Sequence, residues 1–405
     1  MALVREASSV KIGSGRYLVL ACVCAVVSFA CVAVPMFVIR PFRPQGAREM
    51  EIALGVRHAG PWIAGLCAVV VLLLAIRFWK ATRIGGRIVL AGSILLATLG
   101  AVLTQVNVFE KMFHPYDSPS FAAASDVAVD PDDKVLAVTI GQAARAYPIR
   151  TMGYHHIVND TVSGVPIAVT YCTLCHTGLV WSRVIAGKTL HFRLAGINNG
   201  NALLGDEETG SIWQQSTGEA IFGPLKGQQL KEVPTNELTF ALWRSEQPHG
   251  QVLKPDLAYA AQYDPKDWEK HVEKTRTVVD TTNSGIGPHQ LMLGVSFAGE
   301  NKAYPIEAIL AAKLIQDRLG GAPVLIVVGQ DGASIRVFEG DAALTFAARS
   351  GDGVMSDMQT GSMWNFQGCA VEGQQKGLCL KEIDAHKDYW FDWMNHHPES
   401  GVFRS

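Results

Sequence analysis

The sequence of 405 residues lacks the motifs that assign the commonest activities directly. It contains no glycine-rich phosphate loop, no serine-nucleophile elbow and no basic patch suited to nucleic acid. Its formal net charge of −2 gives no overall attraction to nucleic acid or to acidic partners. We therefore expect no nucleic-acid partner.

Cysteine is also scarce. Eight cysteines are too few for a disulfide scaffold in a chain of this length. Four of them lie in apolar runs, where a thiol usually behaves as a small hydrophobic side chain: Cys22, Cys24, Cys31 and Cys67. Of the other four, Cys369 and Cys379 flank a glycine-containing turn and predict a disulfide, whereas Cys172 and Cys175 belong to a different pattern.

Charged residues are missing from three stretches near the N-terminus. The apolar run at 17–39 is long enough to cross a bilayer, which takes about 20 helical residues. Two further runs follow at 61–76 and 88–106, of which the first is the shortest of the three. We therefore expect residues 1–110 to form a membrane anchor of three transmembrane helices, with the lipid bilayer as a partner.

The distribution of basic residues predicts the orientation of this anchor. Lys and Arg precede the first run, at Arg5, Lys11 and Arg16, and they crowd the loop at 77–87. Positive charge is retained on the cytoplasmic side, so both segments are expected inside, although arginines in the first loop depart from the pattern. An odd number of spans then places everything after residue 110 outside the cytoplasm.

The rest of the chain contains one pattern twice, in the same order. Ala-Tyr-Pro-Ile at 146–149 recurs at 303–306, and Thr-Gly-Ser-x-Trp at 209–213 recurs at 360–364. The spacing between matching residues drifts by only a few positions along the chain, which indicates a tandem copy. Two copies favour paired domains over a solenoid, which needs three or more repeats.

Local patterns predict mainly strands within each copy. Runs rich in β-branched and apolar residues predict strands at 135–140, 167–171, 179–185, 189–194, 324–328 and 334–339. Helical spacing of apolar residues predicts helices at 307–319 and 390–397. The expected fold class is α+β, with three N-terminal transmembrane helices followed by two tandem β-rich domains. The expected boundaries are a linker at 111–133, a first repeat at 134–253, a connector at 254–287 and a second, degenerate repeat at 288–405.

The two copies differ where the sequence carries chemically reactive side chains. The first contains Cys172-Thr-Leu-Cys175-His176, with His155 and His156 about one short strand upstream, and the second contains none of these. Glu219 is replaced by Cys369. Because the fold can be built without these residues, we expect one site made of Cys172, Cys175, His155, His176 and His156. Glu219 is expected to act as a general base or to orient a ligand histidine.

Sulfur and imidazole ligands at this spacing favour a transition metal. Two cysteines with one or two histidines fit copper(I) or zinc, and the soft sulfur ligands favour copper. Cys-x-x-Cys-His is also the attachment signature of haem c, which predicts a covalent-haem electron-transfer protein as an alternative. Dithiol redox chemistry is a further alternative. The last is a non-catalytic interaction protein in which Cys172 and Cys175 form a structural disulfide.

Several of these motifs, taken in order, resemble a known family. His155-x-Ile-Val-Asn-Asp, the segment Val-Thr-Tyr-Cys-x-x-Cys at 169–175, the Thr-Gly-Ser-x-Trp motif and Gly-Glu-Ala-x-x-Gly-Pro-Leu at 218–225 are similar to a bacterial family known only as domain of unknown function 3179. The similarity covers about residues 130–253. The resemblance implies an exported or membrane-anchored domain and brings no established activity. We therefore expect a bacterial inner-membrane protein with its C-terminal domains in the periplasm, where a redox or metal-delivery protein would be its partner.

Overall fold

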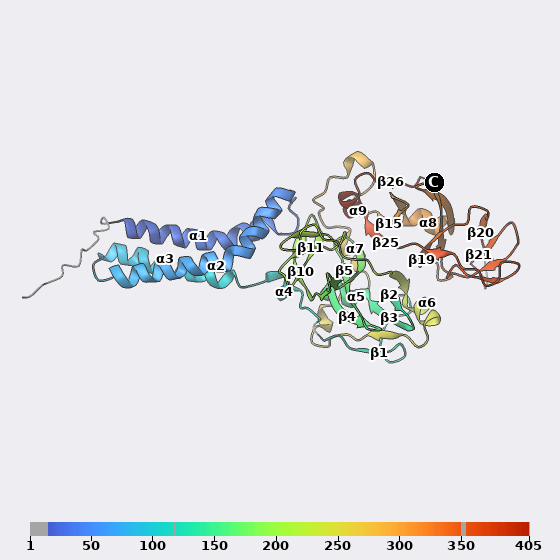
Figure 1. The fold of residues 1–405 in the computed structure, drawn as a ribbon, viewed down its shortest axis with the longest axis horizontal. Coiled ribbons are helices and arrows are strands. Elements are labelled where there is room, and N and C mark those ends of the chain that lie inside the picture. Colours follow the sequence, from blue (N-terminus) through green and yellow to red (C-terminus); the bar gives the residue numbers. More distant parts are fainter. Residues whose placement is uncertain (1–14, 117, 350–353, 405) are drawn as a thin grey trace, which may run out of the picture. The chain divides into compact units, whose positions relative to one another are not determined.

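The computed structural model describes residues 15–116, 118–349 and 354–404 (Figure 1). Within it the chain forms two compact units, which are described separately. One unit holds the long apolar helices, and the other holds residues 109–405 together with the short segment 41–44. The residues Arg5 and Lys11, used above to predict the orientation, lie outside the described residues.

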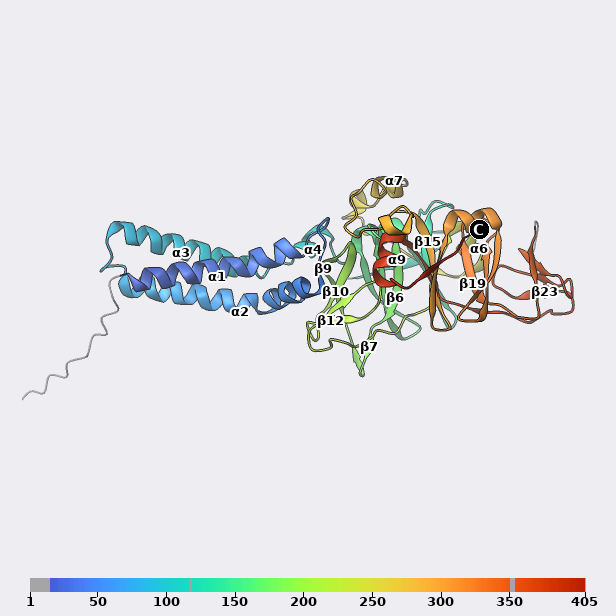
Figure 2. The same ribbon diagram turned by 90° about the horizontal axis from the view of Figure 1, so that it is seen from above.

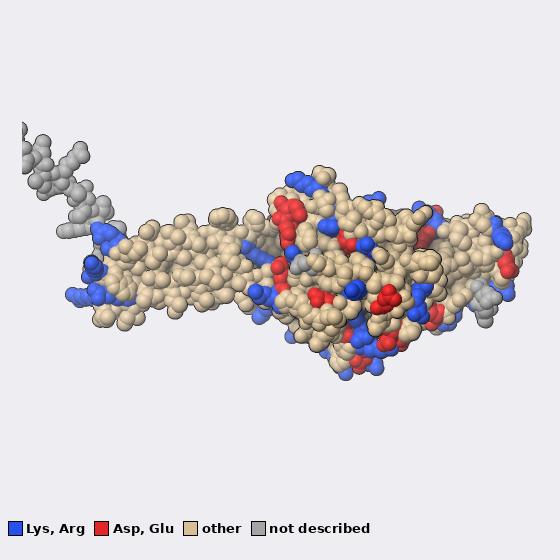
Figure 3. All heavy atoms as spheres, turned by 90° about the horizontal axis from the view of Figure 1, so that it is seen from below, with Lys and Arg blue, Asp and Glu red and all other residues tan. Residues whose placement is uncertain are grey.

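The first unit confirms the three predicted spans. Its helices α1 (Arg16–Val38), α2 (Ala47–Phe78) and α3 (Ile84–Leu103) are each long and apolar enough to cross a membrane. Small residues let α1 and α3 approach closely, and Ser28 donates a hydrogen bond to the carbonyl of Ala97 at 2.8 Å. The face of this unit seen in Figure 3 is uncharged along its middle, and its basic residues gather at the ends.

The second of these helices is longer than the sequence predicts. It begins at Ala47 and continues through Pro61, whereas the predicted span begins at 61. Charged residues in its first turns hide the helix from an apolar-run criterion. A proline inside a membrane helix is tolerated because neighbouring groups compensate for the lost backbone hydrogen bond.

The second unit contains one order of elements twice. We call residues 134–253 the first half and 288–405 the second half. The first half begins with β2 (Lys134–Ile140), β3 (Ala143–Pro148), α5 (Ile149–His155), β4 (Ile157–Val162), β5 (Val165–Cys172) and β6 (Thr177–Ser182). The second half begins with β15 (Leu291–Phe297), β16 (Glu300–Pro305), α8 (Ile306–Ala312), β17 (Leu314–Leu319), β18 (Ala322–Val328) and β19 (Ile335–Glu339).

The later elements of the halves also correspond. The first half continues with β9 (Phe192–Asn198), β10 (Asn201–Asp206), β11 (Ile212–Gln214), β12 (Ala220–Phe222), β13 (Asn236–Thr239), α6 (Phe240–Glu246) and β14 (Gln251–Leu253). The second half continues with β20 (Phe346–Ala348), β21 (Met355–Asp357), β22 (Met363–Trp364), β23 (Ala370–Glu372), β25 (Ala385–Tyr389), α9 (Trp390–His396) and β26 (Gly401–Val402). Short elements complete the chain: α4 (Val108–Met112), β1 (Phe121–Ala123), β7 (Val184–Ile185), β8 (Lys188–Thr189), α7 (Trp268–Val272) and β24 (Lys381–Glu382).

Strand pairing follows the same plan in both halves. The order β14-β3-β2-β13 in one sheet is matched by β26-β16-β15-β25, and β12-β11-β10-β9 is matched by β23-β22-β21-β20. The recurring Thr-Gly-Ser-x-Trp motif has one structural role in both places. The indole of Trp213 donates to Asp206 at 2.8 Å, and that of Trp364 donates to Asp357 at 3.0 Å. The structure therefore has the predicted α+β class with two similar β-rich halves.

The predicted helix at 307–319 is only half correct. Helix α8 ends at Ala312, Lys313 adopts a positive φ of 64°, and β17 then pairs with β18 along its whole length. The apolar spacing continues past the break, but antiparallel pairing with the next strand, across the Gly320–Gly321 turn, decides the conformation. His156 holds the corresponding position after α5, with a φ of 62°.

The C-terminal helices α6 and α9 lie at the junction between the halves. One hydrophobic cluster joins Leu238, Phe240 and Trp243 of the first half to Leu325, Phe338 and Trp364 of the second. Another brings Tyr389 and Phe391 of the second half into the core around Cys172 and Cys175. Figure 2 shows α9 beside β6 in agreement with these contacts. The junction between the halves is therefore part of the core.

Candidate functional site

A tight hairpin holds the two cysteines. Strands β5 and β6 pair in a register that sets Cys172 opposite Thr177, which leaves residues 173–176 as a four-residue loop. Both cysteines are free thiols, and their side chains are 2% and 0% exposed. Their Sγ atoms lie 3.5 and 3.7 Å from one acceptor, the carbonyl oxygen of Gly200. The hairpin therefore directs both sulfurs to the same point.

That carbonyl belongs to a two-residue turn between β9 and β10. Asn199 and Gly200 have φ values of 50° and 100°, as hairpin turns with two positive φ angles require. A Cβ atom added to Gly200 would lie 2.8 Å from the ring of Phe391 in α9. The turn thus approaches the second half so closely that only glycine fits without displacement.

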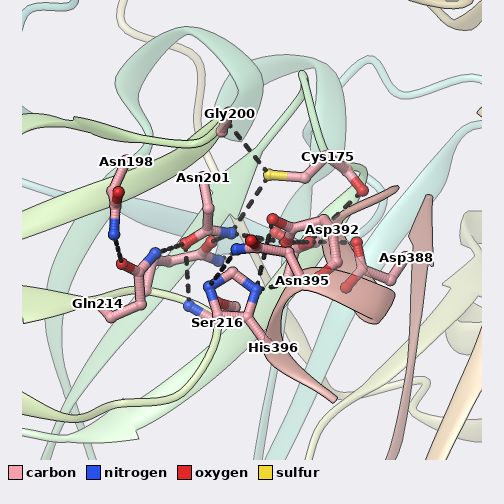
Figure 4. A network of polar contacts seen from close by, with 12 residues as sticks. Cys175, Asn198, Gly200, Asn201, Gln214, Ser216, Asp388, Asp392, Asn395 and His396 are labelled. Carbon is pink, nitrogen blue, oxygen red and sulfur yellow. Dashed lines mark hydrogen bonds and ion pairs between the residues drawn. The ribbon is translucent and has the colours of Figure 1, made fainter. Parts of the chain in front are cut away.

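The second half supplies two buried carboxyl groups to the same place (Figure 4). Thr177 donates to Asp388 Oδ1 at 2.8 Å, and the backbone N–H of Tyr389 donates to the carbonyl of Cys175 at 2.8 Å. The amide nitrogen of Asn201 lies 2.9 Å from Asp392 Oδ2 and 3.3 Å from Cys175 Sγ. Asn201 therefore links a thiol of one half to a carboxyl group of the other.

Burial sets the protonation of this cluster. It raises the pKa of Asp388 well above its usual range, and the neighbouring Asp392 adds to the effect. Burial also raises the pKa of Asp392 despite the nearby His396. The pKa of Cys175 is raised well above its ordinary value by burial, by a hydrogen bond with Cys172 and by the charge of Asp392. Burial therefore shifts all three groups towards their neutral forms.

One oxygen of this cluster has no conventional partner. Asp392 Oδ1 makes no hydrogen bond within the described part of the chain, although the residue is fully buried. The imidazole Nδ1 of His396 lies 3.5 Å away. Buried carboxyl oxygens are usually satisfied, so this one points to a role beyond packing.

The two upstream histidines are engaged elsewhere. His155 Nδ1 lies 2.7 Å from the carbonyl oxygen of His114, and its Nε2 lies 3.1 Å from the hydroxyl of Tyr263. His156 Nδ1 lies 3.2 Å from the carbonyl oxygen of Tyr154, and burial lowers its pKa to about 4. The end of α5 thus places both rings among aromatic residues and not beside the sulfurs.

His176 belongs to a buried charge cluster. Its Nε2 lies 2.7 Å from Glu269 Oε1, and its ring lies against Trp268 of α7. Burial alone would raise the pKa of Glu269, but the hydrogen bond with His176 and the charge of Lys134 hold it well below its usual range. The predicted connector therefore lies over the first half and contributes to its interior.

Glu219 is exposed and takes part in none of these thiol contacts. Its backbone forms an isolated β-bridge with Gln229. The equivalent β-bridge in the second half joins Cys369 and Cys379, which also form a disulfide. The predicted disulfide is confirmed. The replacement of Glu219 by Cys369 thus adds a covalent bond at a backbone bridge that both halves contain.

The positions of the cysteine and histidine side chains show whether they could bind a metal ion together. Among the described residues, no group of three or more His, Cys, Asp or Glu side chains is arranged to hold an ion. The thiols lie together, but His155, His156 and His176 contact other partners, so a Cys2His2 centre does not fit this arrangement without movement. Covalent haem gains no support either, because both thiols are packed inside a hydrophobic cluster. Copper, zinc and haem remain predictions.

Sequence reasoning missed the acidic residues of the site. Asp388 and Asp392 occupy the positions that Leu238 and Leu242 hold in the first half. The loop that corresponds to the cysteine loop faces these leucines, and a Cβ at Gly329 would lie 3.2 Å from Leu242. Thiols face acids at one junction, and a thiol-free loop faces leucines at the other. Comparing the copies for unmatched acids, as well as unmatched cysteines, would have found them.

Comparison with known proteins adds a family and no activity. No curated protein and no solved structure matches this chain. A family profile matches residues 114–400, which is most of the chain and includes both halves. The match therefore extends well beyond the expected 130–253. By this match the chain belongs to the family described as protein of unknown function DUF3179.

Proposed function

We propose that Cys172 and Cys175 form a dithiol–disulfide redox centre in a membrane-anchored protein. The observation that carries the proposal is the pair of unbridged, adjacent thiols directed at one carbonyl from a four-residue loop. Cysteines separated by two residues close a small ring, and such disulfides are more often redox-active than structural. An exchange with a partner disulfide would give the protein disulfide and a reduced partner, with two electrons and two protons passing to the partner.

The buried acids support a reactive centre over an inert one. Burying a carboxyl group is costly unless it is well paired, and the equivalent positions of the first half are filled by leucine. Asp388 and Asp392 are therefore not required by the fold. Their place beside Cys175 suits groups that accept or return a thiol proton during oxidation and reduction.

The proposal includes a location. We infer that the tandem halves lie in the periplasm, on the outer side of a bacterial inner membrane, and exchange electrons with a periplasmic redox protein. The Cys369–Cys379 disulfide supports this, because disulfides persist in oxidising compartments. We also infer that the halves arose by duplication, and that the second was retained because its α9 completes the cysteine site.

Copper(I) binding is the second candidate. The observation in its favour is the same pair of adjacent, unbridged sulfur atoms, since two thiolates suit a soft monovalent ion. In that case both thiols would lose their protons on binding, and a metal-delivery protein would be the partner. The histidines would contribute only after leaving their present contacts.

Thiol trapping tests the redox proposal. The full chain in detergent is reduced, exposed to oxidised dithiothreitol, quenched in acid, denatured, alkylated with a mass tag and mapped by peptide. We expect oxidation to remove the tags from Cys172 and Cys175 and reduction to restore them. In the control variant Cys67→Ser, the tagging of Cys172 and Cys175 should respond to oxidation as in the wild type. In Cys172→Ser, Cys175 should be tagged after both oxidation and reduction. Persistent tagging of both residues in the wild-type chain would overturn the proposal.

A parallel copper(I) titration distinguishes the copper-binding proposal from the redox proposal. Reduced protein competes with a copper(I) chelator of known affinity, and the wild type is compared with Cys172→Ser. Tight binding that the substitution abolishes would favour the copper site. Absence of competition would remove it and leave the redox centre unaffected.

A further inference from the structure

An open pocket lies against the cysteine site. It is a shallow depression open to solvent, with about 290 Å³ of space that includes open solvent, and its lining includes Leu174, Gly200 and Phe391. Leu174 stands between the two cysteines in the hairpin loop, and the carbonyl of Gly200 accepts from both thiols. Phe391 precedes Asp392 in α9. The thiols therefore lie directly behind one wall of this pocket.

The lining combines apolar surface with one positive charge. The apolar part comes from Pro41, Phe42, Leu174, Ile197, Val278 and Phe391, and polar groups come from Asn199, Thr275 and Thr277. Within the described residues the lining contains no Asp or Glu. Ligand sites usually combine an apolar lining with a few polar groups that fix orientation.

Arg276 is the source of the charge. Its side chain is exposed, and it makes no ion pair with any residue that the structure describes. His289 also lines the pocket, where its Nε2 lies 3.5 Å from the hydroxyl of Thr275. Burial lowers the pKa of His289, so this imidazole is neutral near pH 7 and offers hydrogen bonds, not charge. The pocket thus presents an unpaired guanidinium near a buried dithiol.

We propose that this pocket binds small anionic disulfides, with a carboxylate at Arg276 and the sulfur–sulfur bond at Cys172. The inference rests on the proposed redox function and names the class of its substrate. Cys172 is assigned the attack because Cys175 is fully buried, contacts Asn201 and has a thiol pKa raised well above its ordinary value. A cationic side chain in the pocket favours an anionic ligand over a cationic one, because specificity is a difference between two affinities.

The proposed reaction consists of two successive thiol–disulfide exchanges. The sulfur of Cys172 attacks one sulfur of the ligand, the ligand's disulfide bond breaks, and the first thiol leaves with the proton of Cys172. The sulfur of Cys175 then attacks the sulfur of Cys172 in the mixed disulfide, and the second thiol leaves with the proton of Cys175. The protein dithiol is oxidised by two electrons and the ligand is reduced to two thiols.

Three disulfides of similar length and different charge test this assignment: dithiodipropionate (anionic), hydroxyethyl disulfide (neutral) and cystamine (cationic). Each oxidises the reduced full chain in detergent, and its rate is divided by its rate with free dithiothreitol. We expect dithiodipropionate to exceed the neutral compound by about fivefold, the size expected for one exposed charge pair. Cystamine should react more slowly than the neutral compound.

Charge reversal at the pocket supplies the decisive comparison. Arg276→Glu should reverse the order of the anionic and cationic compounds and leave the neutral rate unchanged, and Arg276→Gln should abolish the preference. Lys188→Glu, a matched reversal at an exposed position in the β7–β8 hairpin, should change nothing. Equal normalised rates in the wild type, unaltered by Arg276→Glu, would overturn the pocket assignment alone. Failure of all three compounds to oxidise the dithiol would instead overturn the redox function on which it rests.

Discussion

Replacing Gly200 with alanine tests the contact that joins the two halves at the cysteine site. Alanine at a positive φ costs about 1–2 kcal/mol. The new Cβ would also lie 2.8 Å from the ring of Phe391, a distance that forces a displacement. Overpacking of this kind costs about 1–3 kcal/mol. We therefore expect Gly200→Ala to lower the free energy of unfolding by about 2–5 kcal/mol.

A matched glycine separates the two costs. Gly187 is also the second residue of a two-residue hairpin turn, between β7 and β8, and has a φ of 76°. A Cβ added to Gly187 meets nothing within 4 Å. Gly187→Ala should therefore show only the conformational cost, leaving a difference of about 1–3 kcal/mol between the variants.

Two measurements report the effects of these glycine substitutions. Chemical unfolding of the full chain in detergent gives the difference in stability, and timed alkylation under native conditions gives the accessibility of the thiols. Because the Gly200 carbonyl accepts from both cysteines, its displacement should accelerate alkylation at Cys172 and Cys175 in Gly200→Ala alone. Equal destabilisation in both variants, with unchanged alkylation, would refute the close approach of α9 to this turn.

Three further substitutions probe the surroundings of the site. His156→Asn removes an imidazole whose pKa is about 4 in the fold and near 6.5 when unfolded, so protonation favours unfolding as the pH falls below 6.5. The wild type should lose about 2 kcal/mol more than this variant between pH 7.5 and pH 5 in unfolding titrations, and parallel pH profiles would contradict the burial of this ring. Asp392→Asn removes a negative charge that raises the pKa of Cys175, so native alkylation of Cys175 should move to lower pH; an unchanged profile would separate the acid from the thiol. Cys369→Ser opens the disulfide of the second half and should cost about 2–3 kcal/mol by loop-closure entropy, while trapping of Cys172 and Cys175 stays as in the wild type.

Local signals in the sequence predict much of the fold. Uncharged apolar runs mark α1 and α3, and β-branched runs mark β2, β5 and β18, because burial imposes its period on neighbouring residues. The recurring Thr-Gly-Ser-x-Trp motif helps to predict the similar halves, since its indole binds a carboxylate that is near in the sequence in both copies. The disulfide between Cys369 and Cys379 is likewise a local feature.

The composition of the site depends on contacts that no local pattern contains. Thr177 hydrogen-bonds Asp388 although more than two hundred residues separate them in the chain, because the end of β25 and the start of α9 pack against the cysteine hairpin of the first half. His155 and His156 lie close to the cysteines in sequence, yet the end of α5 turns both rings towards other partners. Proximity in sequence therefore predicts that the two thiols lie together, but it does not predict which other side chains surround them.

The central claim is that Cys172 and Cys175 exchange electrons as one intramolecular pair. An equilibrium titration of the full chain against buffers of reduced and oxidised dithiothreitol, read out by acid-quenched alkylation, tests it most directly. The account predicts a single two-electron transition, with about 30 mV for each tenfold change in the ratio of the two forms, at a midpoint independent of protein concentration. Thiols that stay reduced at every ratio, or that oxidise only by cross-linking two chains, would contradict it.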